Sequence, residues 1–181
     1  QYCDLATSPR RRATQFAMHR IFDSLVRLLA PILAYTAEEA WGYFQPDTSV
    51  HLQDFPKTDP AFTSAETLAT MEQLLQIRGR IAQSIEKIQK GGDIGSALEA
   101  RVKLSSPAAE SAMLTPLKPE LEEIFILSDL EIISDETASA DVTKTPTARC
   151  ERCWRHRSEV GSSAAHPTLC LRCEQAVTAI S

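Results

Sequence analysis

Two cysteine pairs near the C-terminus constrain this 181-residue chain more than any other feature. The segments Cys150-Glu151-Arg152-Cys153 and Cys170-Leu171-Arg172-Cys173 are separated by 16 residues. Two-residue spacing lets both thiolates of a pair reach one ion at about 2.3 Å, and two pairs complete the tetrahedron that Zn²⁺ accepts. No position remains for a catalytic water. The sequence therefore predicts one structural zinc ion, held by Cys150, Cys153, Cys170 and Cys173.

Other uses of these cysteines stay open on the sequence. The four thiols could form two disulfides, hold iron or remain free, although a disulfide framework normally spreads its cysteines along the chain. His156 and His166 lie between the pairs, but with four thiols present we expect neither to bind the metal. Cys3 stands apart and is expected to be an inert thiol. The segment has few apolar residues, so metal binding would supply its folding energy.

Basic side chains gather around the cysteine pairs, although the whole chain has a net charge of −5. That charge argues against a protein that coats nucleic acid indiscriminately. Trp154 follows the first pair directly and stands beside Arg155 and Arg157. An exposed indole among arginines suits the stacking and pairing of single-stranded RNA loops. The alternative is that Trp154 packs against the cysteine pair as core.

Three further arginines, Arg10, Arg11 and Arg12, are predicted to open a helix, where the macrodipole favours anions. Contact with phosphate is one interpretation, and a solvated charged face is the other. Glu38 and Glu39 are interpreted as capping and first-turn residues, not as a paired-carboxylate site. The sequence contains no nucleophile motif and no nucleotide-binding fingerprint, so we expect no catalytic residue in this chain.

Helical periodicity dominates the first half of the chain, over residues 8–45 and 64–90. Pro31 should end the first helix near Ala30. Thr36 and Glu39 have the spacing of a capping box and should begin a second helix. We interpret residues 1–92 as part of an antiparallel helical bundle, and we expect its first helices to lie upstream.

The pattern changes after Ile94. Residues 100–104 alternate between apolar and charged side chains, which predicts a half-buried strand. Residues 116–123 are predicted to form a short helix, and residues 124–134 a second strand. We interpret residues 93–140 as a small α+β unit at the junction.

The third predicted region, residues 141–181, contains a linker and the cysteine module. Residues 135–148 are polar and are interpreted as a linker or an edge strand, and Cys173–Ile180 should form a final helix. The predicted fold is therefore mainly α: an antiparallel helical bundle, a small α+β unit and a C-terminal four-cysteine zinc finger. No apolar run approaches the ~18 residues of a membrane span.

Several segments resemble the C-terminal end of class I aminoacyl-tRNA synthetases. Residues 29–33 (LAPIL) and 36–41 (TAEEAW) look like the anticodon-binding bundle of the enzymes for isoleucine, valine and leucine. Residues 94–102 are similar to the segment that follows the bundle in isoleucyl enzymes. Residues 150–154 and 166–173 resemble the zinc finger of bacterial-type isoleucyl enzymes. Further matches are Arg11-Arg12-Ala13, Val50-His51-Leu52 and Phe55-Pro56.

The resemblance implies a cytoplasmic, monomeric enzyme that activates isoleucine with ATP and attaches it to its tRNA. In this family, the bundle and the zinc end grip the anticodon stem-loop. The HIGH and KMSKS motifs are absent here, as is any editing domain, so we expect the catalytic and editing domains elsewhere in the same polypeptide. The expected RNA contacts are Trp154, Arg155, Arg157, Arg10, Arg11 and Arg12.

Two alternatives compete with this hypothesis. The finger also resembles that of formamidopyrimidine-type DNA glycosylases, but those use an N-terminal proline nucleophile and this chain starts with Gln1. The other alternative is a zinc-stabilised protein-interaction module. Binding assays distinguish the three hypotheses. A tRNA-binding module should bind tRNA with an affinity that falls steeply as salt rises. A glycosylase fragment should prefer damaged duplex DNA, and an interaction module should bind neither.

Overall fold

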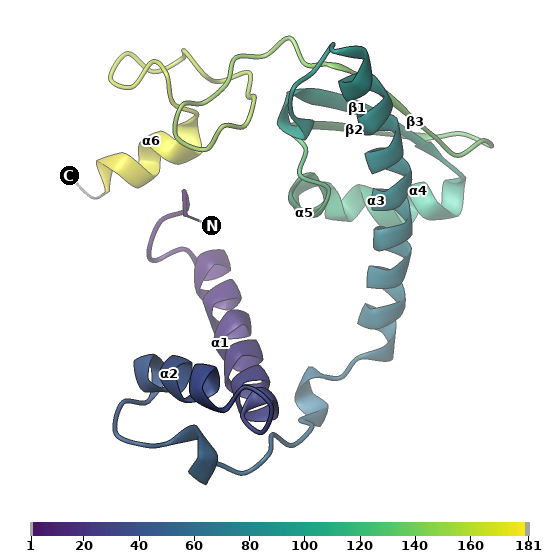
Figure 1. Cartoon of the computed structure of the whole chain (residues 1–181). Coiled ribbons are helices and arrows are strands. Elements are labelled where there is room, and N and C mark those ends of the chain that lie inside the picture. The colour runs from purple at the N-terminus through teal and green to yellow at the C-terminus, as the bar shows by residue number, and fades with distance from the viewer. Residues whose placement is uncertain (1, 180–181) are drawn as a thin grey trace. The chain divides into compact units, whose positions relative to one another are not determined.

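The computed structural model describes residues 2–179 and divides by its contacts into two compact units, Gln1–Ser64 and Ala65–Ser181 (Figure 1). The chain is mainly helical, with one small sheet and a cysteine cluster near the C-terminus. This confirms the predicted fold class in its coarse form. Among the described residues, no helix combines the length and the apolar character needed to cross a membrane.

The first unit is built on two helices, α1 (Pro9–Leu29) and α2 (Ala34–Phe44), followed by the short 3-10 turns Val50–Leu52 and Pro60–Phe62. Pro9 suits the start of α1 because its ring presets the helical φ. Pro31 follows Ala30, the C-cap residue of that helix, as predicted. The small core between the helices consists of Val26, Ala30, Ala37, Trp41 and Val50.

The capping box predicted at Thr36 is wrong. The helix α2 begins two residues earlier, at Ala34, with Leu33 at its N-cap and no side-chain cap. The amide of Leu33 donates to the carbonyl of Leu29, so the backbone turns back into helix immediately after Pro31. Glu38 caps a loop instead: its Oε2 accepts from Ser49 Oγ at 2.9 Å and from the Val50 amide at 3.0 Å.

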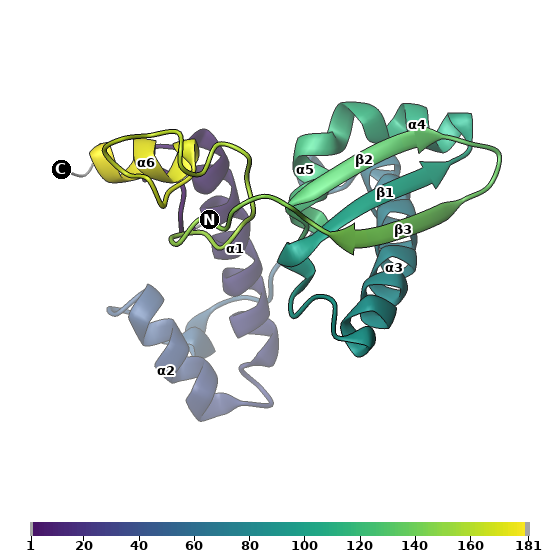
Figure 2. The same ribbon diagram turned by 90° about the horizontal axis from the view of Figure 1, so that it is seen from above.

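In the second unit, helices lie on one face of a three-stranded sheet with the strand order β2-β1-β3 (Figure 2). β1 pairs with β2 in parallel and with β3 antiparallel. A parallel pair needs a crossover, and α4 and α5 supply it between β1 and β2. The elements are α3 (Ala65–Gly91), β1 (Ala100–Ser106), α4 (Ala108–Leu114), α5 (Lys118–Ile124), β2 (Asp129–Ser134), β3 (Ser139–Lys144) and α6 (Leu171–Thr178).

The two faces of this sheet differ in character. One face is apolar and packs against the helices, in a cluster that includes Ile81 of α3, Val102 and Leu104 of β1, Leu121 of α5 and Leu130 of β2. The opposite face is charged: Arg101 lies 3.3 Å from Asp129 and 3.6 Å from Glu131. The alternation along β1 therefore does what its pattern predicted, with apolar side chains inward and charges outward.

Several predicted boundaries shift. The helix α5 runs to Ile124, and β2 begins only at Asp129 after a turn in which Ile126 has a φ of 59°. The prediction of a strand from residue 124 was therefore wrong at its start, because a short apolar run fits a buried helix end equally well. Residues 135–148 contain β3, which pairs only with β1 and so confirms the edge-strand interpretation. Ile180, at the end of the predicted last helix, lies outside the described residues.

The contact boundary does not fall at residue 92, where the predicted bundle ended. It falls after Ser64, because Leu74, Ile77, Ile81 and Ile85 of α3 pack in the sheet cluster. The long helix was correctly predicted, but its periodicity could not reveal which element covers its apolar stripe. The division into residues 1–92, 93–140 and 141–181 therefore stays a prediction.

Candidate metal centre

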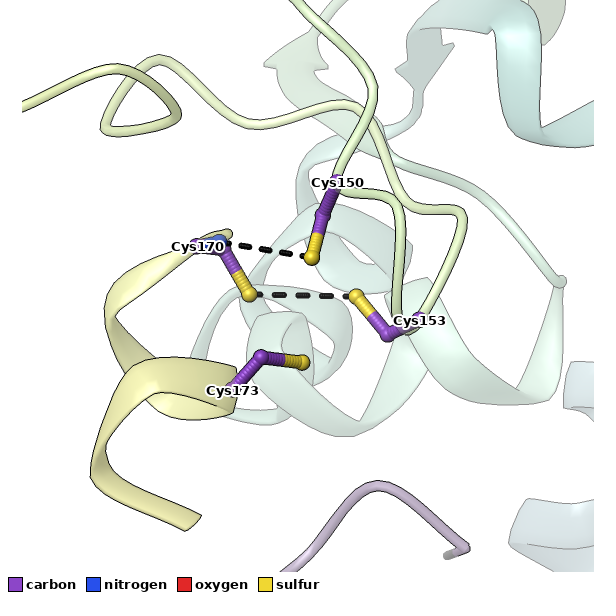
Figure 3. A group of neighbouring side chains, drawn as sticks. All are labelled: Cys150, Cys153, Cys170 and Cys173. Carbon is purple, nitrogen blue, oxygen red and sulfur yellow. Dashed lines mark hydrogen bonds between the residues drawn. The ribbon is translucent and has the colours of Figure 1, made fainter. Parts of the chain in front are cut away.

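The four predicted cysteines converge on one point in the second unit (Figure 3). Their sulfurs all lie within 4.8 Å of one another, although the pairs are far apart in sequence. A tetrahedral ion with metal–sulfur distances of about 2.3 Å places its ligands about 3.8 Å apart. The Sγ atoms of Cys153 and Cys170 are 3.8 Å apart. None of the five cysteines forms a disulfide, so the structure fits a single metal site and not the two-disulfide alternative.

The first cysteine pair sits on a tight turn. The amide of Trp154 donates to the carbonyl of Cys150 at 2.8 Å, and the amide of Cys150 donates to the carbonyl of Arg155 at 2.9 Å. Closing this turn requires a left-handed residue directly after Cys153, and Trp154 adopts it with a φ of 64°. Such a conformation is uncommon for a bulky residue, because its Cβ crowds the following carbonyl. The turn aims both sulfurs of the pair inward.

The second cysteine pair begins the helix α6. Cys170 is the N-cap residue and Cys173 lies in the first turn, where the helix dipole favours thiolates. The amide of Cys170 donates to Sγ of Cys150 at 3.3 Å, which ties the two pairs together (Figure 3). Cys150, Cys170 and Cys173 are buried, and Cys153 is partly exposed. The module therefore buries sulfurs where a larger domain would bury an apolar core.

Electrostatics around the sulfurs call for a cation. Burial alone would raise the pKa of Cys150, but N–H groups of Cys153, Cys170 and Arg152 outweigh it and lower that pKa to about 6. Burial raises the pKa of Cys170 and of Cys173, and Arg152 only partly opposes it at Cys173. Four thiolates cannot share this space without a positive charge among them. A metal cation bound between the sulfurs would supply that charge.

Loading the centre with zinc at neutral pH is therefore expected to release protons, those of Cys170 and Cys173 among them. Their raised pKa keeps both thiols protonated in the free protein, whereas Cys150 with a pKa of about 6 is already a thiolate. The apparent affinity for zinc should consequently rise as the pH rises through neutrality. Isothermal titration calorimetry in buffers of different ionisation enthalpy counts the protons. Zinc binding without proton release would contradict the assignment.

The two histidines near the cysteines do not belong to the cluster. Nδ1 of His156 lies 2.6 Å from the carbonyl oxygen of Thr147, and the His156 amide donates to Ser128 Oγ at 2.9 Å. The His166 amide donates to Ser163 Oγ at 3.3 Å. That neither histidine binds the metal stays a prediction.

Trp154 is an exposed side chain on the turn that Cys150 and Cys153 define. Its side chain is 63% exposed, so the alternative in which the indole packs as core does not hold. The guanidinium carbon of Arg149 lies 6.0 Å from the centre of the indole ring, within reach of a cation–π contact. The turn thus presents an aromatic face with a cation beside it.

Arg155 and Arg157, in contrast, have protein partners. Arg157 Nη2 donates to Glu122 Oε2 at 2.8 Å, and Arg155 Nη2 donates to the Glu122 carbonyl at 3.0 Å. Burial, with repulsion from Arg157 and Arg172, lowers the pKa of Arg155, while Glu122 opposes the shift. Sequence reasoning missed Glu122; the only signal was an acidic pair in a predicted helix beside a basic finger.

The remaining predicted contacts, Arg10, Arg11 and Arg12, lie in the first unit at the start of α1. Arg11 Nη1 donates to the carbonyl of Asp4 at 2.9 Å, and Arg10 and Arg12 are exposed. Three basic residues in the first helical turn agree with the predicted placement. Their contact with RNA stays a prediction.

Two protein families match the chain. The anticodon-binding domain of tRNA ligase matches residues 1–104, and the zinc finger found in FPG and IleRS matches residues 149–176. The second match covers all four clustered cysteines. The first covers both helices of the first unit, the helix α3 and the start of β1.

Curated relatives share this region. The chain is 36% identical over 190 residues to the isoleucine–tRNA ligase of Syntrophotalea carbinolica, covering 98% of the chain and 20% of that protein. It is 37% identical over 177 residues to the enzyme of Stenotrophomonas maltophilia, covering 94% of the chain and 19% of that protein. The chain thus spans about a fifth of the length of these relatives. Because the anticodon-binding model matches more than half of its residues, the chain belongs to the tRNA ligase family that this domain defines.

Proposed function

We propose that the chain is the tRNA-binding portion of an isoleucine–tRNA ligase, which activates isoleucine with ATP and attaches it to its tRNA. The observation that carries the proposal is the exposed indole of Trp154 on a turn fixed by two metal-binding cysteines. The names of the relatives supply the amino acid, and the anticodon-binding match supplies the region of the tRNA. The match over residues 1–104 favours a ligase over a DNA glycosylase, which the finger alone would leave open.

One zinc ion, held by Cys150, Cys153, Cys170 and Cys173, is part of the proposal. All four ligands come from the protein, so the ion takes no part in a reaction and stabilises the module. The finger family supports zinc over other metals, and the convergence of the four sulfurs supports a single ion. No residue of this chain is assigned a catalytic role.

The RNA surface that we propose is the zinc turn, with the start of α1 as a second contact. A base of the anticodon loop would stack on Trp154, and Arg10, Arg11 and Arg12 would bind phosphates. The open sheet face is a poor platform, because Arg101 pairs there with Asp129 and Glu131 and the described strands place no aromatic side chain on it. Arg155 and Arg157 contact Glu122 and would support RNA binding only indirectly.

The antiparallel bundle belongs to the same proposal, as do the three predicted domains, a monomeric state and a cytoplasmic location. Apolar side chains on α1 and on the first turns of α3 are exposed, which supports a bundle completed by further helices of the polypeptide. They include Ile21, Leu25, Leu28, Leu68 and Leu75. The resemblance to bacterial-type synthetases supports the location.

The proposal is tested by RNA binding. The zinc-loaded chain is expected to bind an isoleucine anticodon stem-loop, with an affinity that falls steeply as salt rises. An acceptor-stem minihelix of the same tRNA is the control and should bind much more weakly. Fluorescence anisotropy with both RNAs and with damaged duplex DNA measures the preference. Equal affinity for the two RNAs, or a preference for the DNA, would contradict the proposal.

A further inference from the structure

The carboxylate of Glu122 on α5 lies close to two arginines of the zinc finger, Arg155 and Arg157. Glu122 Oε2 is 2.8 Å from Arg157 Nη2 and 3.9 Å from Arg155 Nη1. The Glu122 carbonyl also accepts a hydrogen bond from Arg155, near the C-terminal end of the helix. The side chains of Glu122 and Arg155 are only 13% and 12% exposed. The helix dipole adds partial negative charge at this end of α5. Both the dipole and the Glu122 carboxylate therefore attract the guanidinium groups of Arg155 and Arg157.

Further polar contacts join the finger to the segment from α5 to β2, and we call this contact surface the α5 seam. Glu123 Oε1 lies 3.8 Å from Arg172 Nη1 and 4.0 Å from Arg155 Nη1. The buried hydroxyl of Ser128 accepts from the His156 amide at 2.9 Å. Residues on both sides of the cysteine loop thus attach to the α5–β2 segment. A polar seam with partly buried partners fixes geometry more tightly than exposed ion pairs, because water competes less for the same groups.

The arginines of the finger therefore divide into three groups. Arg155, Arg157 and Arg172 face the acidic pair on α5, whereas Arg149 lies beside the exposed indole of Trp154. Arg152 donates to Cys173 Sγ at 3.7 Å, within the cysteine cluster. Without Glu122, the guanidinium groups of Arg155 and Arg157 would repel each other across a partly buried gap. Loss of that carboxylate should loosen the seam while leaving the four sulfurs in place, since none of them contacts Glu122.

We propose that Glu122 is a positioning residue for RNA binding: it clamps the finger to α5 through Arg155 and Arg157 and so fixes the direction in which Trp154 is presented. The inference rests on the proposed tRNA-binding function and deepens it. It assigns Arg155 and Arg157 to the interior of the protein, not to the RNA. The RNA then contacts Trp154 and Arg149, and the contacts of Glu122 with Arg155 and Arg157 fix the orientation of that surface.

The test uses the zinc-loaded chain with Glu122→Gln, Arg157→Gln, the double variant, and Glu120→Gln as the control on an exposed position of the same helix. Affinity for the isoleucine anticodon stem-loop is measured over a series of salt concentrations. Each single variant is expected to bind roughly tenfold more weakly, which is an ordinary size for coupling between sites. The double variant should bind no more weakly than either single variant, since both remove one clamp. Zinc content and the binding of Glu120→Gln should match the wild type.

The slope of affinity against salt separates positioning from direct contact. An arginine that neutralises a phosphate contributes about 0.7–0.9 to that slope. Arg157→Gln should therefore leave the slope unchanged. A slope reduced by that amount, additive losses in the double variant, or wild-type binding by Glu122→Gln would each overturn the proposal.

Hydrogen exchange keeps the clamp separable from the proposed function. The amide of His156 donates to Ser128 at the seam, so its exchange should be faster in Glu122→Gln than in Glu120→Gln. Equal exchange in the two variants would refute the clamp. If the wild type binds no RNA, the proposed function fails and the positioning role fails with it, while this measurement still decides whether Glu122 holds the finger.

Discussion

Replacing Cys173 with serine is expected to lower the affinity for zinc by about a hundredfold or more and to unfold residues 149–176. A structural zinc ion contributes most of the folding free energy of a small finger. The buried side chains of this finger are mainly the cysteines themselves, with Ala176 as an addition. Removing one thiolate therefore removes both a ligand and part of the core.

The rest of the second unit should survive this substitution. Its hydrophobic cluster runs from Leu74 to Leu130 and includes no residue of the finger. Hydrogen exchange is therefore expected to rise over residues 149–176 and along the α5 seam, while β1 and the C-terminal half of α3 stay protected.

Cys3→Ser is the matched control, because Cys3 lies outside the cluster and forms no disulfide. It should retain wild-type zinc content, measured by elemental analysis, and wild-type exchange. Concerted loss of protection in β1 and α3 after Cys173→Ser would show that the finger and the core fold as one unit, contrary to expectation.

Replacing Trp154 with glycine is expected to weaken binding of the anticodon stem-loop by about 1–3 kcal/mol, the usual contribution of one base stacked on an aromatic ring. Glycine is the informative replacement. Trp154 occupies a left-handed conformation, which glycine adopts freely, so the variant removes the indole and relieves backbone strain together. Zinc retention should stay equal or improve, and a loss of RNA affinity could not then be blamed on a damaged finger.

Two further variants complete the comparison. Trp154→Phe keeps an aromatic face and should recover part of the affinity. Leu171→Ala removes an exposed apolar side chain from the same module and should have no effect on RNA binding. Equal binding by the wild type and Trp154→Gly would remove Trp154 from the contact surface, whatever the behaviour of the other variants.

The parts of the structure that sequence predicted well are those with local causes. The convergence of the four cysteines was predicted from the spacing within each cysteine pair and from the preference of four thiolates for one metal ion. The helix α3 followed from a periodic apolar stripe and a glycine pair, and Gly92 indeed takes a positive φ of 84° where the helix ends. The strand β1 followed from strict alternation.

What the sequence did not reveal depended on distant partners. The helix α4 was missed because seven residues between two prolines carry too short a pattern for a periodicity argument. The capping box at Thr36 had the right residues, but the backbone had already turned into helix at Leu33. Arg155 was predicted to contact RNA because it stands beside Trp154, and the sequence did not reveal its partner Glu122, which lies 33 residues earlier in the chain. The sequence gives the charge of a residue, but it does not give the partner that the residue contacts in the fold.

The polar character of the α5 seam also bears on how such a finger can be gained or lost during evolution. A module that docks through an apolar patch leaves that patch bare when it is deleted, and bare patches aggregate. Here deletion would expose Glu122, Glu123 and the hydroxyl of Ser128, all of which water hydrates readily. Loss of the finger would therefore leave polar groups at this contact for water to hydrate.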